Sequence, residues 1–119
     1  MEVMAMARKY IYISGKMTGL SKKEYQAKFN QAERKLRSDG FRVFNPTDPS
    51  WTHYFDEHNS SYGEILWHDL RKLMECDAVY MLDNFLESKG AKTEHAFAIA
   101  TGKEIIYDEE LYNNGTLRR

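Results

Sequence analysis

The segment 77–84, with the sequence DAVYMLDN, restricts the possible folds more than any other part of the chain. Its centre is a continuous apolar run, which is typical of a strand that is buried on both faces of a parallel sheet. Such a strand needs helices on both sides of the sheet, and right-handed crossover connections place them there. This segment therefore predicts an α/β fold.

Similar apolar runs predict three more strands, with helical patterns between them. These strands are expected at 8–14 (RKYIYIS), 41–45 (FRVFN) and 104–107 (EIIY). The alternation predicts a three-layer, flavodoxin-like or Rossmann-like fold. We expect a parallel sheet of about four or five strands, in an order such as 2-1-3-4, with helices on both faces.

The first helical pattern has a recognisable start and end. Ser21 and Glu24 have the spacing of a capping box, and Gly40 is expected to close the helix. Between them, apolar residues recur at helical spacing: Tyr25, Phe29, Ala32 and Leu36. Further helices are expected at 62–76 (YGEILWHDLRKLMEC) and in the alanine-rich part of 87–108.

The segment 46–63 (PTDPSWTHYFDEHNSSYG) contains both prolines of the chain and has little periodicity. It predicts a long loop with a helical turn near residues 51–55. A loop of this length in a small domain is usually functional, often as a lid or a pocket wall.

The composition indicates one folded domain that spans residues 1–119. Lys and Arg number 17 against 18 Asp and Glu, and this balance argues against a general nucleic-acid binder. The single cysteine, Cys76, cannot form an intrachain disulfide, and the four histidines lack the spacing of a transition-metal site. We therefore expect no metal and no other cofactor.

The remaining signals concern location. No apolar run has the roughly 18 to 20 residues that a membrane span needs. The leading MEVMAMARKY places its basic residues after a very short apolar stretch, which is the wrong order for a signal peptide. A cytoplasmic protein is expected.

Ligands of open parallel sheets bind beyond the carboxyl ends of the strands. The loop after the first strand, SGKMTG, fits neither the ATP-type P-loop nor the dinucleotide pattern. Its backbone N–H groups, together with a helix N-terminus, could still hold one phosphate. Lys16 would add a positive charge there, although a solvated lysine is an equal alternative. At the opposite end of the strand 77–84, Asp77 is expected to lie far from the site.

Asp69 is anomalous because it falls in the middle of an apolar helical stripe, formed by Ile65, Leu66, Leu70 and Leu73. Burial of an unpaired carboxylate is costly, so this position needs a reason. A structural reason would be a loop cap or a pair with an arginine. The functional alternative is a carboxylate whose pKa is adjusted for catalysis.

Two further carboxylates lie on the ligand side. Asp83 ends the apolar strand, where it either accepts hydrogen bonds from sugar hydroxyls or forms a turn with Asn84. Glu94 is expected in about the first turn of its helix, where the helix N-terminus favours the ionised form that suits a nucleophile. The alternative for Glu94 is an ordinary first-turn glutamate.

Four segments together resemble the nucleoside 2-deoxyribosyltransferase-like superfamily: YIYISGKMTG, FRVFNP, HDLRKLMECDAVYMLD and SKGAKTEHAFAIATGK. The chain is most similar to the DUF4406 proteins and more distantly resembles the 2′-deoxynucleoside 5′-phosphate N-hydrolases. The resemblance implies that Glu94 is the nucleophile, that Asp69 orients the sugar or serves as the acid, and that Tyr12 lies beside the sugar. It also implies Ser88 as a phosphate ligand, whereas Lys16 replaces the serine of the first loop.

The resemblance further implies a homo-oligomer, a dimer or larger, in which the tail of a neighbour reaches the site; Asn113 and Asn114 are the candidates here. Trp51, Tyr54 and Trp67 could stack on a base, although we expect Trp67 in the core. The substrate-binding residues expected from all these loops are Ser14, Gly15, Lys16, Met17, Asn45, Trp51, Asp83, Ser88 and Gly90.

The predicted function is cleavage of the N-glycosidic bond of a nucleoside or nucleoside 5′-monophosphate, with water or another base as acceptor. A carboxylate close to C1′ suits this chemistry because the transition state resembles an oxocarbenium ion. The alternative is a module that binds a nucleotide without cleaving it. Lys92 and His95 favour that alternative, since they are expected to bring positive charge close to Glu94.

Overall fold

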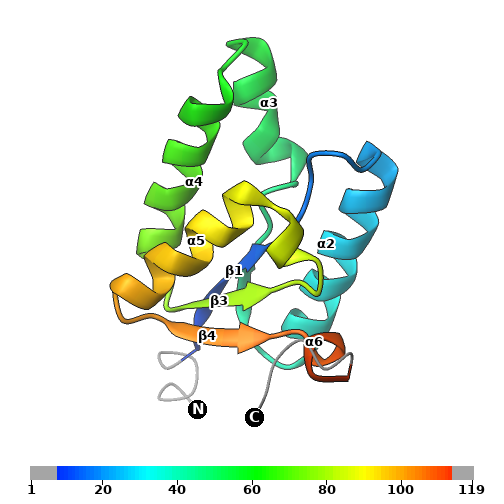
Figure 1. Ribbon diagram of the computed structural model, residues 1–119, viewed down its shortest axis with the longest axis vertical. Coiled ribbons are helices and arrows are strands. Elements are labelled where there is room, and N and C mark those ends of the chain that lie inside the picture. Colours follow the sequence, from blue (N-terminus) through cyan, green and yellow to red (C-terminus); the bar gives the residue numbers. More distant parts are fainter. Residues whose placement is uncertain (1–7, 114–119) are drawn as a thin grey trace.

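The computed structural model describes residues 8–113, which form a parallel four-stranded sheet covered by helices on both faces (Figure 1). The strand order is β2-β1-β3-β4, as predicted. Three strands occupy part of their predicted apolar runs: β1 is Tyr10–Ser14, β2 is Arg42–Phe44 and β3 is Ala78–Met81. The fourth, β4 (Glu104–Tyr107), has the predicted bounds.

One face of the sheet is covered by α2 (Lys22–Ser38). The predicted capping box is present, because the Ser21 hydroxyl accepts from the Glu24 N–H and the Glu24 carboxylate accepts from the Ser21 N–H. The buried face of α2 packs against alternate residues of β1, Ile11 and Ile13. The other residues of β1 therefore point to the opposite face of the sheet.

That opposite face is covered by α4 (Tyr62–Glu75) and α5 (Lys89–Ala100). Its core contains Tyr12 of β1, Leu73 of α4 and Ala98 of α5, all fully buried. The 3-10 turn η1 (Phe85–Glu87) precedes α5, and the short α6 (Glu109–Asn113) follows β4.

The predicted long loop contains a nine-residue helix, α3 (Pro49–Glu57), where we expected a single turn. Asp48 caps this helix, because its carboxylate accepts from the Ser50 N–H at 2.9 Å. Pro49 then occupies the first turn of the helix. Proline suits this position because its φ is already helical, and because a backbone N–H in the first turn would have no helical partner. Pro49 therefore marks a helix start, and Phe55 anchors the helix by burial.

The prediction that Trp67 lies in the core is wrong, since 54% of its surface is exposed on α4. The Arg71 guanidinium lies over its ring, 5.0 Å from the centroid. Tyr54 is also half exposed, and its ring stacks on His58. Among residues 8–113, no helix is both long and apolar enough to cross a membrane.

Candidate functional site

The Glu94 carboxyl is buried and has a hydrogen-bond partner on each oxygen. Its side chain is only 6% exposed, and each oxygen accepts a hydrogen bond of 2.6 Å, one from the Tyr12 hydroxyl and one from the Ser14 hydroxyl. Tyr12 and Ser14 are two residues apart in β1, so the strand presents both on the face that α5 covers. Three predicted site residues are thus brought together.

The prediction that the helix N-terminus keeps Glu94 ionised has to be corrected. Glu94 lies in the second turn of α5, which begins at Lys89, and not in the first turn. Burial, followed by the negative charge of Asp69, raises the pKa of Glu94 from 4.5 to about 8, although the two hydrogen bonds lower it. Burial therefore outweighs the helix end, and the carboxyl is mainly protonated at neutral pH.

Asp69 is buried on the apolar stripe of α4, as predicted. The Trp51 indole N–H donates to its Oδ1 at 2.8 Å, so its partner comes from α3 and is not an arginine. Burial raises the pKa of Asp69 from 3.8 to about 6, and the bond from Trp51 lowers it. Asp69 and Glu94 are thus two buried carboxyls, and the negative charge of Asp69 disfavours the ionisation of Glu94.

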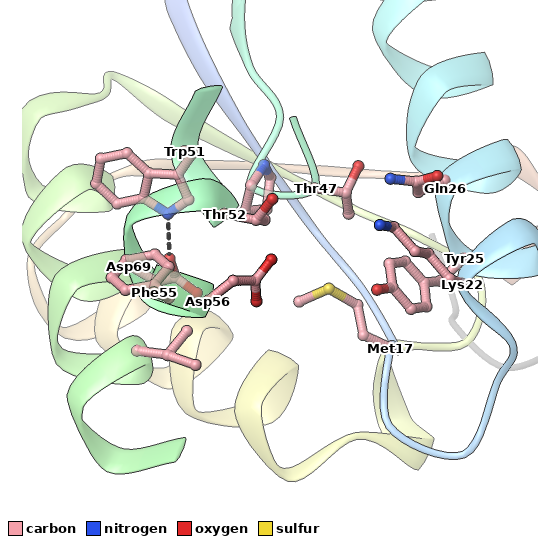
Figure 2. A pocket seen from close by; sticks show the side chains of 12 residues that line it. Met17, Lys22, Tyr25, Gln26, Thr47, Trp51, Thr52, Phe55, Asp56 and Asp69 are labelled. Atoms are coloured by element: carbon pink, nitrogen blue, oxygen red, sulfur yellow. Dashed lines mark hydrogen bonds between the residues drawn. The ribbon is translucent and has the colours of Figure 1, made fainter. Parts of the chain in front are cut away.

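Two cavities adjoin at this pair. The Asp56 cavity, of about 300 Å³, lies between α2, α3 and α4 and is lined by residues that include Lys22, Gln26, Trp51, Thr52, Asp56 and Asp69 (Figure 2). The Glu94 cavity, of about 160 Å³, is lined by residues that include Gly15, Met17, Asp69, Ser88, Gly90 and Glu94. Met17, Ile65 and Asp69 line both, so Asp69 stands where the cavities meet.

Two glycines of the Glu94 cavity allow close approaches that a side chain would prevent. A Cβ atom on Gly15 would lie 2.5 Å from Leu82 Cδ1, and one on Gly90 would lie 2.6 Å from the Tyr62 hydroxyl. Ser88 is the N-cap of α5, and its hydroxyl accepts from the Ala91 N–H at 3.1 Å. Gly15, Ser88 and Gly90 thus lie together around the Glu94 cavity.

Asn45 was expected to contact substrate, but it lies inside the protein. Its amide donates to Asn30 at 2.9 Å and to Glu33 at 3.0 Å, and its carbonyl oxygen accepts from the backbone and hydroxyl of Thr47. It lines neither of the two cavities. Its contacts make it a support for the turn that follows β2.

Lys16 and Asp83 also lie away from the carboxyl pair. The Lys16 ammonium pairs with Glu87 at 3.1 Å, and Asp83 pairs with Lys28 of α2 at 2.6 Å. Asp83 lines a different cavity, which it shares with residues of α2 and α6. The structure therefore separates Asp83 from Glu94 although both follow the same strand.

The positive charge that we expected around Glu94 is not found there. The His95 ring packs against Phe85, and its Nε2 lies 2.8 Å from the Tyr107 hydroxyl. Burial lowers the pKa of His95, which favours its neutral form. Neither His95 nor the exposed Lys92 lines the two cavities. Of the predicted tail residues, Asn113 ends α6, and Asn114 lies outside the described residues.

The polar lining of the Asp56 cavity, formed by Lys22, Gln26, Thr52 and Asp56, was missed from the sequence. The signal that could have found it is Asp48 followed by Pro49, which marks a helix start. With α3 recognised, Thr52 and Asp56 are four residues apart and share a helix face. Within residues 8–113, no group of three His, Cys, Asp or Glu side chains could hold a metal ion.

The comparison with protein families gives one match. The family described as a domain of unknown function, DUF4406, matches residues 9–107. This span contains all four strands together with Tyr12, Asp69 and Glu94. No curated protein matches the chain.

Proposed function

The chain belongs to the DUF4406 family, and we propose that it cleaves the N-glycosidic bond of a nucleoside or nucleoside 5′-monophosphate. The family description assigns no activity, so the proposal rests on the site. The observation that carries it is the buried Glu94 carboxyl, fixed by Tyr12 and Ser14 beside a cavity that it shares with Asp69.

This arrangement supplies the two carboxyls that glycosidic bond cleavage uses. Between pH values of about 6 and about 8, which are the pKa values of Asp69 and Glu94, the pair holds one proton. One carboxylate and one carboxylic acid are what a nucleophile and an acid require. Transfer of this proton between Glu94 and Asp69 leaves the charge of the pair unchanged.

The roles follow from the two cavities. With the sugar in the Glu94 cavity, an oxygen of Glu94 attacks C1′ while the C1′–N bond breaks and its electron pair leaves with the base. Asp69, at the junction, gives its proton to that base. Water then attacks C1′ and displaces Glu94, and its proton returns to Asp69; a second base in place of water gives transfer.

Tyr12 and Ser14 act as positioning residues for the nucleophile. Burial and the nearby carboxylates raise the pKa of Tyr12, so its hydroxyl stays protonated and keeps donating to Glu94. The two hydrogen bonds hold the carboxylate in one orientation, which favours attack at one carbon.

The proposal is tested by incubating the protein with a panel of nucleosides and 5′-monophosphates, with and without a free acceptor base. Release of base is expected, and Glu94→Gln should abolish it. The matched control is Glu57→Gln, which removes an exposed carboxylate of α3 that pairs with His53. No release of base from any compound would overturn the catalytic proposal.

A second candidate is a non-catalytic nucleotide-binding module. The raised pKa of Glu94 favours it, because a protonated carboxyl is not a nucleophile and can still bind a sugar hydroxyl. Calorimetry separates the two candidates. Tight binding of an intact nucleotide that persists in Glu94→Gln, without release of base, would support the binding module.

We also propose that the protein works in the cytoplasm as a homo-oligomer. Exposed apolar side chains on α4 and α5, such as Trp67, Met74 and Ile99, are suited to an interface between copies. Light scattering on the purified protein measures the assembly. A monomer at micromolar concentration would contradict this part of the proposal.

A further inference from the structure

The Asp56 cavity has an acceptor on one wall and donors on the other. Asp56 and Thr52 of α3 face Lys22 and Gln26 of α2 across it, and the Asp56 carboxylate points toward its centre (Figure 2). Among the side chains that the structure describes, those of Lys22, Gln26 and Asp56 have no hydrogen-bond or ion-pair partner. These groups are therefore available to a ligand.

The cavity also has apolar surfaces suited to the faces of an aromatic ring. Met17 and Phe55 are among its lining residues, and Trp51 is held in place by its bond to Asp69. A volume of about 300 Å³ is at the small end of ligand sites, which span roughly 300 to 1,000 Å³. The cavity thus suits a flat heterocycle with polar edges.

Its position relative to the carboxyl pair identifies which part of a substrate it would hold. Glu94 lines only the other cavity, whereas Asp69 lines both. With C1′ near Glu94, the group that leaves C1′ extends past Asp69 into the Asp56 cavity. The leaving base is therefore the part that would contact Asp56.

We propose that Asp56 selects the base and that the preferred base is guanine, a 2-amino-6-oxopurine; this rests on the function proposed above. An ionised carboxylate only accepts hydrogen bonds, so it favours an edge with two adjacent donors. Guanine offers N1–H beside its 2-amino group. Adenine and cytosine place an acceptor nitrogen beside their amino group, and uracil and thymine place their single N–H between two carbonyl groups.

The opposite wall fits the same base. Guanine carries its acceptors, O6 and N7, on the edge next to N1–H. Lys22 donates only, and the Gln26 amide can donate, so both suit these two acceptors. Hypoxanthine has the same acceptors and lacks the 2-amino group, which makes it the comparison that isolates the contact with Asp56.

The test is a competition among 2′-deoxyguanosine, 2′-deoxyinosine, 2′-deoxyadenosine, 2′-deoxycytidine and 2′-deoxyxanthosine, supplied both as nucleosides and as 5′-monophosphates and measured as release of base. Calorimetric binding of the same compounds to Glu94→Gln is the second readout. The rate of base release and the binding affinity should both be about 10-fold to 100-fold higher for deoxyguanosine than for deoxyinosine, as one bidentate base contact implies. Asp56→Asn should remove this preference and favour deoxyxanthosine, whose 2-oxo group accepts from the new amide.

Glu57→Gln is the matched control, since it removes one negative charge from the same helix at a residue that does not line the cavity. It should keep the guanine preference. Equal cleavage of all bases, or an unchanged preference in Asp56→Asn, would overturn the inference and leave the proposed cleavage intact. Selective binding of deoxyguanosine without any cleavage would support Asp56 as the selector and overturn only the catalytic role. Absence of both binding and cleavage would overturn both proposals.

Discussion

The buried carboxyl of Glu94 should make the protein less stable as the pH rises from about 5 to about 8. In this range the unfolded chain has an ionised Glu94, whereas the folded protein keeps the proton, because its pKa is raised from 4.5 to about 8. Folding then takes up a proton, so the free energy of unfolding falls with rising pH. At about 1.4 kcal/mol per pH unit, the full loss is on the order of 5 kcal/mol.

Glu94→Gln isolates this contribution. The amide resembles the protonated carboxyl: its oxygen accepts one hydrogen bond, and its NH₂ group donates to the hydroxyl of Tyr12 or Ser14. Near pH 5 the variant and the wild type should have similar free energies of unfolding. Near pH 8.5 the variant should be more stable by several kcal/mol.

Urea unfolding at a series of pH values measures both proteins, and their difference removes the titration of the groups that do not interact with Glu94. The free energy of unfolding of Glu57→Gln should depend on pH as that of the wild type does, since the Glu57 side chain is more than half exposed. A difference between wild type and Glu94→Gln that is constant across the range would refute the reasoning. The reasoning would also be refuted if the free energy of unfolding of the wild type rose relative to that of the variant with increasing pH.

Three further predictions concern the pair and its cavity. The pH profile of base release should be bell-shaped, with limbs near the pKa values of Asp69, about 6, and Glu94, about 8. In Asp69→Asn the remaining activity should rise with pH along a single limb. The midpoint of this limb should lie below 8, because the charge of Asp69 no longer raises the pKa of Glu94. A bell that persists unchanged in Asp69→Asn would contradict this assignment. Trp51→Phe should raise the pKa of Asp69 above about 6, because the lost hydrogen bond lowers it; carboxyl titration by NMR measures the change, and an unchanged value would contradict the role of the indole. Gly90→Ala should raise KM and leave the free energy of unfolding nearly unchanged, since the new Cβ displaces the exposed Tyr62 ring at the Glu94 cavity; an unchanged KM would show that the ring does not border the substrate.

The positions of the strands and helices along the chain could be predicted because they depend on local patterns. Each strand is a short apolar run, and each crossover carries a helix with its own start signal, such as Ser21 and Glu24. The position of Asp69 was also predictable, since the helical stripe of α4 places it toward the sheet regardless of its neighbours. These predictions needed only the period of one element.

The charge state of Glu94 could not be read in this way. The sequence reveals its distance from a helix end, whereas its pKa depends on how α5, α4 and β1 exclude water together. The same limit explains Asn45 and Asp83. Both follow strands at the expected edge, but their partners, Glu33 and Lys28, come from α2 and turn them away from the cavities.

In the proposed mechanism, the helix α3 separates the recognition of the base from the cleavage of the glycosidic bond. It carries Trp51, Thr52 and Asp56 on the cavity wall, and it is anchored by the burial of Phe55 and by the bond from Trp51 to Asp69. Glu94 and its two hydroxyl partners lie on α5 and β1 and do not touch the cavity that Asp56 lines. If the proposed base site is correct, substitutions at residues 52 and 56 should change which base is accepted while the hydrogen bonds to Glu94 stay in place. A substitution of Trp51 should affect both the base site and Asp69, because the indole lines the Asp56 cavity and donates a hydrogen bond to Asp69.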